Sequence, residues 1–307
     1  MKAELKFERI SEVADSPIRL GSIEAGGTKF ILAVGDPYLN VIQKVEIPTT
    51  TPEETLALAV KFFEENPVEA IGIGSFGPID INRKSPTYGH VLATPKQGWE
   101  GFDFLGTMKR AVDVPYEFVT DVASSVYGEL VQGAARGCDS AVYYTIGTGI
   151  GGAGIQNGDF IGGRMHSEMG HMYVAKHPLD KEFAGVCPFH GDKCAEGLAA
   201  GPAIEARYNV KGQHLPEEHE VWDILAYYIA QIAYNTSVVL GPEKIIFGGG
   251  VFNQKHLMPM VHEWFERINN GYVSVPPLHE YIVKSGFDNN ESATIGNFAL
   301  ALEQLKK

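Results

Sequence analysis

The chain has 307 residues, 44% of them hydrophobic, which is enough for one large domain or two of ordinary size. Its 25 Lys and Arg against 38 Asp and Glu give a formal net charge of −13, which argues against a nucleic-acid-binding surface. No run approaches the ~18 uninterrupted apolar residues that a membrane span requires.

The first twenty residues are expected to form an N-terminal extension, residues 1–20, that lies outside the fold. They alternate charged and apolar residues and lack the apolar core of a secretory signal. We therefore expect a cytoplasmic protein that binds neither nucleic acid nor membrane.

Two glycine-rich hairpins are predicted, one in each half of the chain. The stretches "RLGSIEAGGTKFILAVGD" (19–36) and "SAVYYTIGTGIGGAGIQNGD" (140–159) each contain an apolar run, a Gly-Thr turn and a second strand-like run. This order is typical of two strands joined by a tight turn. The repetition indicates a duplicated sheet-and-helix unit, with coincidence among 35 glycines as the alternative.

The remaining patterns alternate between helix and strand, as in an α/β protein. A capping box of Thr51 and Glu54 predicts a helix over 51–66. The apolar run at 70–80 suits a buried strand. Further patterns indicate a strand at 116–119, a long buried helix around 219–240, a glycine-rich segment at 245–253 and a final helix over 292–307.

Three glycine-rich turns could each bring backbone N–H groups close to a phosphate. They are Gly26-Gly27-Thr28-Lys29, Gly147 to Gly152, and Gly248-Gly249-Gly250. None matches a P-loop, and none opens a helix as a dinucleotide-binding turn does. One such turn is usually only a turn, but three in one chain favour an anionic ligand, with phosphate the best candidate.

Asp121 follows the strand-like "YEFV" and precedes a helical run, which is where α/β sheets place ligands. A carboxylate there can accept the proton of a hydroxyl that attacks a phosphorus atom. The alternative is that Asp121 only caps the helix that follows.

His171, Cys187, His190 and Cys194 form a candidate zinc site within the loop 166–197. Four soft or borderline ligands are the set that a closed structural zinc site takes, and such a loop buries little apolar surface of its own. His166 and His177 are rival ligands, more ordinarily surface histidines, and two inert thiols are the alternative. Cys138 matches no ligand and is expected to be an ordinary buried thiol.

Several motifs, in this order, resemble the bacterial ROK sugar kinases and, within them, the zinc-containing fructokinase branch. They are "GSIEAGGTKF", "GIGSFGPID", "LATPKQGW", "TDVASSVYGE", "TIGTGIGGAGI", "HSEMGHMYV", "CPFHGDKCAEGLAAGP" and "IIFGGGV". The resemblance extends from about Leu20 to the C-terminus. It implies ATP-dependent phosphorylation of D-fructose to fructose 6-phosphate.

The resemblance also implies an actin-like (ribonuclease-H-like) α/β fold, in which two similar domains face a central cleft. Its expected boundaries are 21–122 for the N-terminal domain, with the helix 291–307 packed back on it, and 123–290 for the C-terminal domain. Mg²⁺ with ATP, a structural Zn²⁺ and a homodimer are further expectations.

Residue roles follow from the same resemblance. Asp121 is the expected catalytic base. Sugar contacts are expected from Gly77, Thr120, Asp121, Glu168, His171 and Glu196. Nucleotide contacts are expected from Gly26, Gly27, Thr28, Lys29, Thr148, Gly149, Pro202, Gly248, Gly249, Gly250, Val251 and Phe252. The expected zinc ligands are His171, Cys187, His190 and Cys194.

The chain departs from its relatives at Ala123 and Ser124, where many of them have Asn and Ala, so an amide contact to the sugar is lost. A kinase for mannose, glucose or N-acetylmannosamine is therefore the main alternative. A sugar-responsive repressor is disfavoured, because only about twenty residues precede the first motif and the chain is acidic. A sugar-binding protein without catalysis is disfavoured by Asp121 and the three turns.

Overall fold

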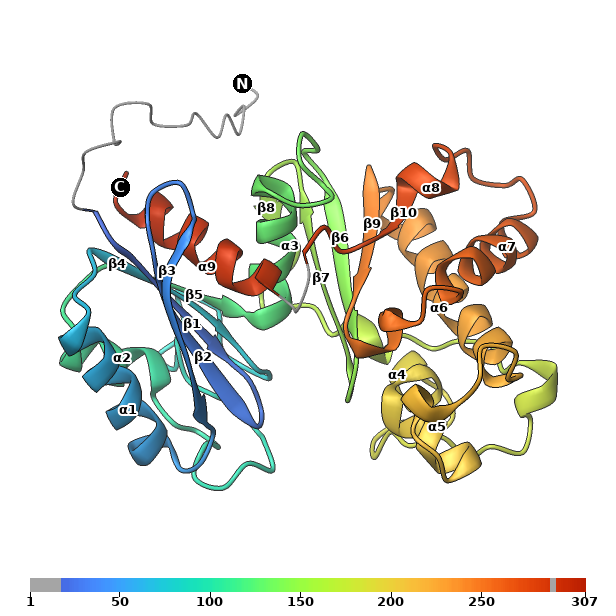
Figure 1. The fold of residues 1–307 in the computed structure, drawn as a ribbon, viewed down its shortest axis with the longest axis horizontal. Coiled ribbons are helices and arrows are strands. Elements are labelled where there is room, and N and C mark those ends of the chain that lie inside the picture. The colour runs from blue at the N-terminus through green and yellow to red at the C-terminus, as the bar shows by residue number, and fades with distance from the viewer. Residues whose placement is uncertain (1–17, 288–290) are drawn as a thin grey trace. The chain divides into compact units, whose positions relative to one another are not determined.

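The computed structural model describes residues 18–287 and 291–307, which form two α/β units (Figure 1). Unit 1 runs to Gly137 and also includes Phe160–His166 and Gly286–Lys307, whereas unit 2 consists of Cys138–Asp159 and Ser167–Ser285. The proposed extension 1–20 lies mostly outside the described residues, and Leu20 begins the first strand.

The sheet of unit 1 has five strands in the order β3-β2-β1-β4-β5. Their bounds are β1 Leu20–Ala25, β2 Lys29–Gly35, β3 Val41–Pro48, β4 Ala70–Ser75 and β5 Tyr116–Thr120. Strands β1, β4 and β5 are parallel neighbours, while β2 is antiparallel to both of its neighbours, β1 and β3. The carboxyl ends of β1, β4 and β5 therefore meet at one edge of the sheet.

Helices cover both faces of this sheet: α1 (Pro52–Glu65) and α2 (Phe104–Ala111) on one face, α3 (Asp121–Val131) and α9 (Glu291–Gln304) on the other (Figure 1). Helix α9 packs closely because glycines face it. A Cβ on Gly72 would stand 2.1 Å from the Asn297 carbonyl oxygen, and one on Gly128 would stand 2.0 Å from that of Ser292. Since α3 packs along α9, it groups with unit 1, later than the expected boundary at residue 122.

The sheet of unit 2 repeats the plan of unit 1. Its order is β10-β9-β6-β7-β8, with β6 Ala141–Ile146, β7 Ile150–Gln156, β8 Asp159–Phe160, β9 Lys244–Gly248 and β10 Ile282–Lys284. In both sheets an antiparallel hairpin comes first, and two parallel strands follow on the side of its first strand. The duplication predicted from the two Gly-Thr turns is thus confirmed.

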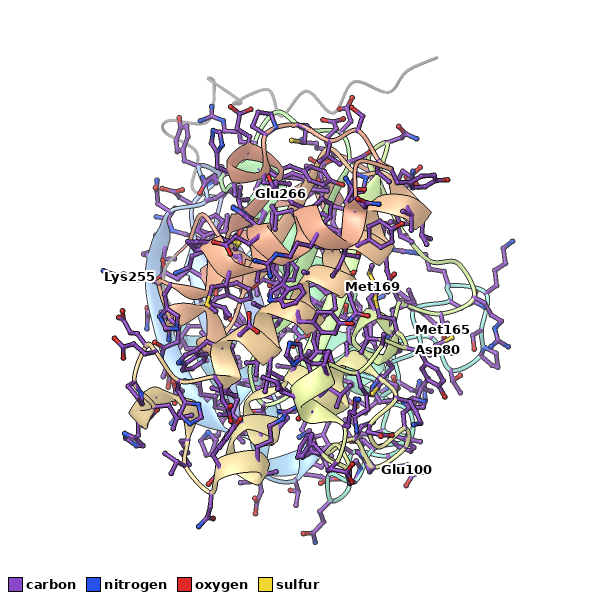
Figure 2. All side chains as sticks on the ribbon, turned by 90° about the vertical axis from the view of Figure 1, so that its right-hand side faces the viewer. Asp80, Glu100, Met165, Met169, Lys255 and Glu266 are labelled. Carbon is purple, nitrogen blue, oxygen red and sulfur yellow. The ribbon has the colours of Figure 1, made fainter. Side chains whose placement is uncertain are left out.

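The helices of unit 2 pack around α6 (Val221–Leu240), whose buried side chains span most of its length. The others are α4 Ala195–Ala199, α5 Gly201–Tyr208, α7 Leu257–Asn269 and α8 Leu278–Tyr281, with short 3-10 helices η1 Met169–His171, η2 Pro178–Asp180, η3 Gly212–His214 and η4 Gly250–Asn253. Figure 2 looks onto this unit, with Glu266 of α7 and Met169 of η1 labelled.

Several predicted elements are confirmed with small shifts. Thr51 caps α1 by accepting a hydrogen bond from the Glu54 N–H at 3.4 Å. The run at 70–80 is a strand only as far as Ser75, and Pro78 cannot continue it because proline has no N–H to donate to a sheet. No helix among the described residues is both long and apolar enough to cross a membrane.

Candidate functional site

The parallel strands of unit 1 bring three predicted site segments to one edge of its sheet. The Gly26–Lys29 turn follows β1, Gly77 follows β4, and Asp121 follows β5. The segment after β4 lies against the end of β1, since the Phe76 N–H donates to the Ala25 carbonyl at 2.8 Å. Ligands of open α/β sheets bind at such carboxyl ends, so this edge of unit 1 is a candidate site.

Asp121 is the first residue of α3, and the helix cap is supplied by its neighbour. The Thr120 hydroxyl accepts a hydrogen bond from the Ala123 N–H at 3.2 Å, which makes Thr120 the N-cap. One Asp121 oxygen, Oδ1, accepts from the adjacent Val122 N–H at 2.9 Å. The N-cap of α3 is therefore Thr120 and not Asp121.

The first glycine turn is a tight hairpin with exposed backbone at its tip. The Gly26 N–H donates to the Lys29 carbonyl at 2.9 Å and closes the turn. The N–H groups of Gly27 and Thr28 have no hydrogen-bond partner in the described part of the chain. The Lys29 ammonium pairs with Glu46 of β3 at 2.6 Å. The turn therefore offers an anion the two backbone N–H groups of Gly27 and Thr28.

Glu24, in β1, is a site residue that the sequence analysis missed. Its Oε2 atom is buried, and no hydrogen-bond partner for it exists among residues 18–287 and 291–307. Burial, followed by the nearby charge of Asp121, raises the pKa of Glu24 to about 7. The sequence did contain an indication, because Glu24 is an acidic residue within the apolar run "GSIEAGG", just before the glycine turn that carries the free N–H groups.

The raised pKa of Glu24 should make the free energy of unfolding depend on pH. Its folded-state pKa of about 7 exceeds the ordinary 4.5, so the folded protein binds more protons between these values. The stabilisation is fully present below pH 4.5 and is lost as pH rises through about 7, by at most about 3 kcal/mol. We expect Glu24→Gln to remove this loss in urea unfolding between about pH 5.5 and about pH 8 without added Mg²⁺. An equal loss in both proteins would contradict the prediction.

In unit 2, the second glycine turn lies beside the start of α5. The Gly147 N–H donates to the Gly149 carbonyl at 2.9 Å, and the Gly201 N–H donates to the Gly147 carbonyl at 2.7 Å. The predicted residues Thr148 and Pro202 are thereby brought close together. Gly249, with φ of 88°, lies so near the end of β6 that a Cβ would meet the Ile146 carbonyl oxygen at 2.4 Å.

The other predicted nucleotide residues of unit 2 lie at the same end of its sheet. Gly248 is the last residue of β9, and Gly250, Val251 and Phe252 form η4. Val251 and Phe252 are buried in the core, so their side chains shape the segment from beneath. The backbone of the glycine segment is what remains for a ligand.

Glu196 of α4 connects the glycine turn to the metal cluster. Its Oε2 accepts a hydrogen bond from the Ile150 N–H at 3.0 Å, and its Oε1 lies 3.9 Å from His171 Nε2. Glu168 precedes η1, where its carbonyl accepts from the His171 N–H at 3.1 Å. The backbone of Glu168 and the carboxylate of Glu196 therefore both lie next to His171.

The four predicted zinc ligands converge in unit 2, with their ligand atoms all within 4.8 Å of one another. His171 Nδ1 lies 3.8 Å from Cys187 Sγ and 3.7 Å from Cys194 Sγ, and His190 Nδ1 lies 3.7 Å from Cys187 Sγ. Ligands about 2.0–2.3 Å from a tetrahedral zinc stand about 3.3–3.8 Å apart. The three Nδ1–Sγ distances therefore match the ligand spacing of a tetrahedral zinc site.

Burial makes this cluster unfavourable for a bare thiolate. Cys194 is 0% exposed, and desolvation raises the pKa of its thiol to about 11. A cation in the cluster would supply the charge that a thiolate needs.

The rival ligands are engaged elsewhere. His166 Nε2 accepts from the Ile79 N–H at 3.1 Å, and His177 Nδ1 accepts from the Leu179 N–H at 3.2 Å. Both side chains are buried, contrary to the surface positions expected from the sequence. Hydrogen bonds from Lys176 and Lys193 lower the pKa of Asp192 to about 2 and occupy its oxygens. Cys138, expected to be buried, is only partly so.

A second attachment holds the loop that carries the metal cluster. Arg207 of α5 donates two hydrogen bonds to Asp180 of η2, at 2.9 and 2.7 Å, and each side chain is only 4% exposed. The Tyr228 hydroxyl of α6 donates to the same carboxylate at 2.7 Å. The middle of the loop is thus tied to two helices independently of any metal.

Comparison with known proteins identifies the family. The sequence profile described as "ROK family" matches residues 20–304. The chain belongs to the ROK family. This confirms the resemblance seen in the sequence motifs.

Two curated relatives of this ROK protein carry the name fructokinase. The one from Lactococcus lactis subsp. cremoris is 49% identical, over 94% of this chain and 98% of the relative. The one from Streptococcus mutans serotype c is 51% identical, over 92% and 96%.

A solved structure of a ROK hexokinase from Thermus thermophilus has the same fold. It superposes with a TM-score of 0.75 at 24% identity, over 94% of this chain and 99% of that one. The expected actin-like α/β class is therefore confirmed for this ROK protein.

Proposed function

We propose that this protein is an ATP-dependent fructokinase, which transfers the γ-phosphoryl group of ATP to the 6-hydroxyl of D-fructose. The proposal is supported chiefly by about half identity, over nearly the full length, to two proteins named fructokinase. Asp121 and the free N–H donors of the first turn, at one sheet edge of unit 1, supply the groups that phosphoryl transfer needs.

Asp121 is the general base of this mechanism. Its carboxylate accepts the proton of the 6-hydroxyl while that oxygen forms a bond to phosphorus and the bond to the ADP oxygen breaks. Gly77, Thr120, Glu168, His171 and Glu196 bind the sugar. The Gly26–Lys29 turn, Thr148, Gly149, Pro202 and the 248–252 segment bind ATP. Backbone N–H groups do this well, because their dipoles are fixed before the charge develops.

Use of ATP by a kinase implies Mg²⁺, and unit 1 offers a suitable donor set. The buried, unpaired Oε2 of Glu24 and the carboxylate of Asp121 are the hard oxygen ligands that Mg²⁺ or its bound waters would contact. Bound there, Mg²⁺ would neutralise charge on the phosphates.

The His171, Cys187, His190 and Cys194 cluster holds a structural zinc in this proposal. Four protein ligands leave no position for substrate, which is the arrangement of structural rather than catalytic zinc. The metal positions the sugar site, because His171 presents Nδ1 to the cysteines and Nε2 to Glu196. We also propose that the protein is a homodimer, as expected from the family, and that it acts in the cytoplasm, where ATP is supplied.

The deciding experiment is an ADP-release assay with ATP and Mg²⁺ over fructose, mannose, glucose and N-acetylmannosamine. We expect kcat/KM for fructose to exceed the others by about tenfold or more, because a sugar of the wrong stereochemistry leaves polar groups of the pocket without a partner. A higher value for another hexose would assign the pocket to that sugar, and no turnover with any would refute the kinase.

A further inference from the structure

Lys96 is a charged residue at the unit 1 edge to which no role has yet been given. It belongs to the "TPKQGW" segment, far in sequence from the first glycine turn. Its ammonium nevertheless donates a hydrogen bond to the Gly27 carbonyl at 3.0 Å and lies 5.0 Å from the centre of the Phe76 ring. A Cβ on Gly27 would stand 2.4 Å from this nitrogen, so glycine at position 27 makes room for the ammonium.

Rigid packing holds Lys96 in place. Trp99, three residues later, is fully buried and its ring N–H donates to the Thr50 carbonyl at 2.8 Å. The Trp99 backbone N–H also donates to the Lys96 carbonyl at 3.1 Å, which closes a turn between them. Because this packing already restricts the lysine, it loses little further conformational entropy when it binds a ligand.

The charge of Lys96 is not neutralised by the protein. No carboxylate lies within ion-pairing distance of it in the described part of the chain, whereas nearby Lys29 is paired with Glu46. The ammonium borders an open pocket of about 460 Å³ that Gly27 and Thr50 also line, with Glu54 as its other charged residue. A ligand anion can therefore reach Lys96 from solvent.

The position of Lys96 along the edge of the sheet indicates which anionic group it would bind. Its contacts lie at the ends of β1 and β4, and the next strand, β5, ends at Asp121. Neighbouring strands are about 4.8 Å apart. The contacts of Lys96 therefore lie on the segments that follow β1 and β4, one strand away from the segment that carries Asp121.

We propose that Lys96 contacts the phosphoryl group in transfer, as the γ-phosphate of ATP before the reaction and as the 6-phosphate of the sugar after it. The assignment rests on the proposed kinase activity. As the hydroxyl oxygen bonds to phosphorus, its proton moves to Asp121, and ADP leaves. The ammonium of Lys96 stabilises the negative charge on the oxygens of the moving group. If Lys96 had only a structural role, holding its loop against the glycine turn, its loss would weaken the binding of every ligand by the same factor.

The test is Lys96→Met, which keeps an apolar stem over Phe76 and removes the charge. We expect kcat/KM to fall about a hundredfold, the usual cost of a lost electrostatic stabiliser. Calorimetry should show a non-hydrolysable ATP analogue and fructose 6-phosphate binding about tenfold more weakly or worse. The affinities of ADP and fructose, which lack the moving group, should be unchanged. Lys109→Met on α2, an exposed lysine that, like Lys96, has no ion pair in the described part of the chain, is the matched control.

Equal weakening of all four ligands, or none, would overturn the proposal. Lys96→Arg, which keeps the charge, should retain more activity than Lys96→Met, and equal loss would argue for a steric role. If the Lys96→Met protein does not fold, Lys96 is needed for the fold, and this too would contradict a role limited to binding the phosphoryl group. Failure of the kinase proposal is seen separately, as lack of turnover by the unmodified protein.

Discussion

Asp121→Asn is expected to lower kcat by a factor of about 10² or more while the fold and the metal cluster remain intact. The amide cannot accept the proton of the sugar hydroxyl, and it differs from the carboxylate by little in size. Folding should be spared because Thr120, not Asp121, caps α3. Initial rates with fructose and ATP, circular dichroism and metal analysis would measure the three quantities.

Asp103→Asn provides the matched control for Asp121→Asn. Asp103 also stands at a helix start, where its Oδ1 accepts from the Gly106 N–H at 2.8 Å, a role that Asn fills equally well. Its variant should turn over normally. Near-normal turnover of Asp121→Asn would remove that residue from the mechanism.

Removal of zinc is expected to lower thermal stability and activity together. Without the metal, four buried or half-buried ligands are left close together, and the position of His171 beside Glu196 is released. A loss of about 3 kcal/mol would lower Tm by roughly 6–12 °C for a protein of this size. Calorimetric melting and fructose phosphorylation, before and after chelation verified by metal analysis, would show the change.

Cys194→Ser should reproduce the effect of chelation, and Cys138→Ser, outside the cluster, should not. Restoration of both Tm and activity by added Zn²⁺ is the expected reversal. Full activity after verified metal loss, or a purified protein without zinc, would mean that the cysteines have no role in shaping the site.

The architecture was largely predictable because its signals are local. A Gly-Thr turn between two apolar runs specifies a hairpin, so the two hairpins and their repetition were recognised from sequence. The grouping of α3 with unit 1 arises from its packing on α9, which lies at the other end of the chain, so no local sequence pattern shows it.

The site was predictable only where its residues lie in close sequence motifs. Cys187, His190 and Cys194 are near in sequence, and His171 completes the set of four ligands as the more distant histidine. Glu24 and Lys96 were missed because their importance comes from neighbours distant along the chain: Asp121 for one, Gly27 for the other. Likewise, only the structure could show that Thr120, rather than Asp121, starts α3.

The buried Asp180–Arg207 pair affects how the protein would survive metal depletion. Because η2 is fastened to α5 and α6 by hydrogen bonds that involve no metal, apoprotein should fray only on the two flanks of the loop, around His171 and from Cys187 to Cys194. Because the middle of the loop stays attached, the zinc ligands on its two flanks remain close to one another. Zinc depletion should therefore inactivate the protein reversibly without unfolding it, and added zinc should restore activity without synthesis of new protein.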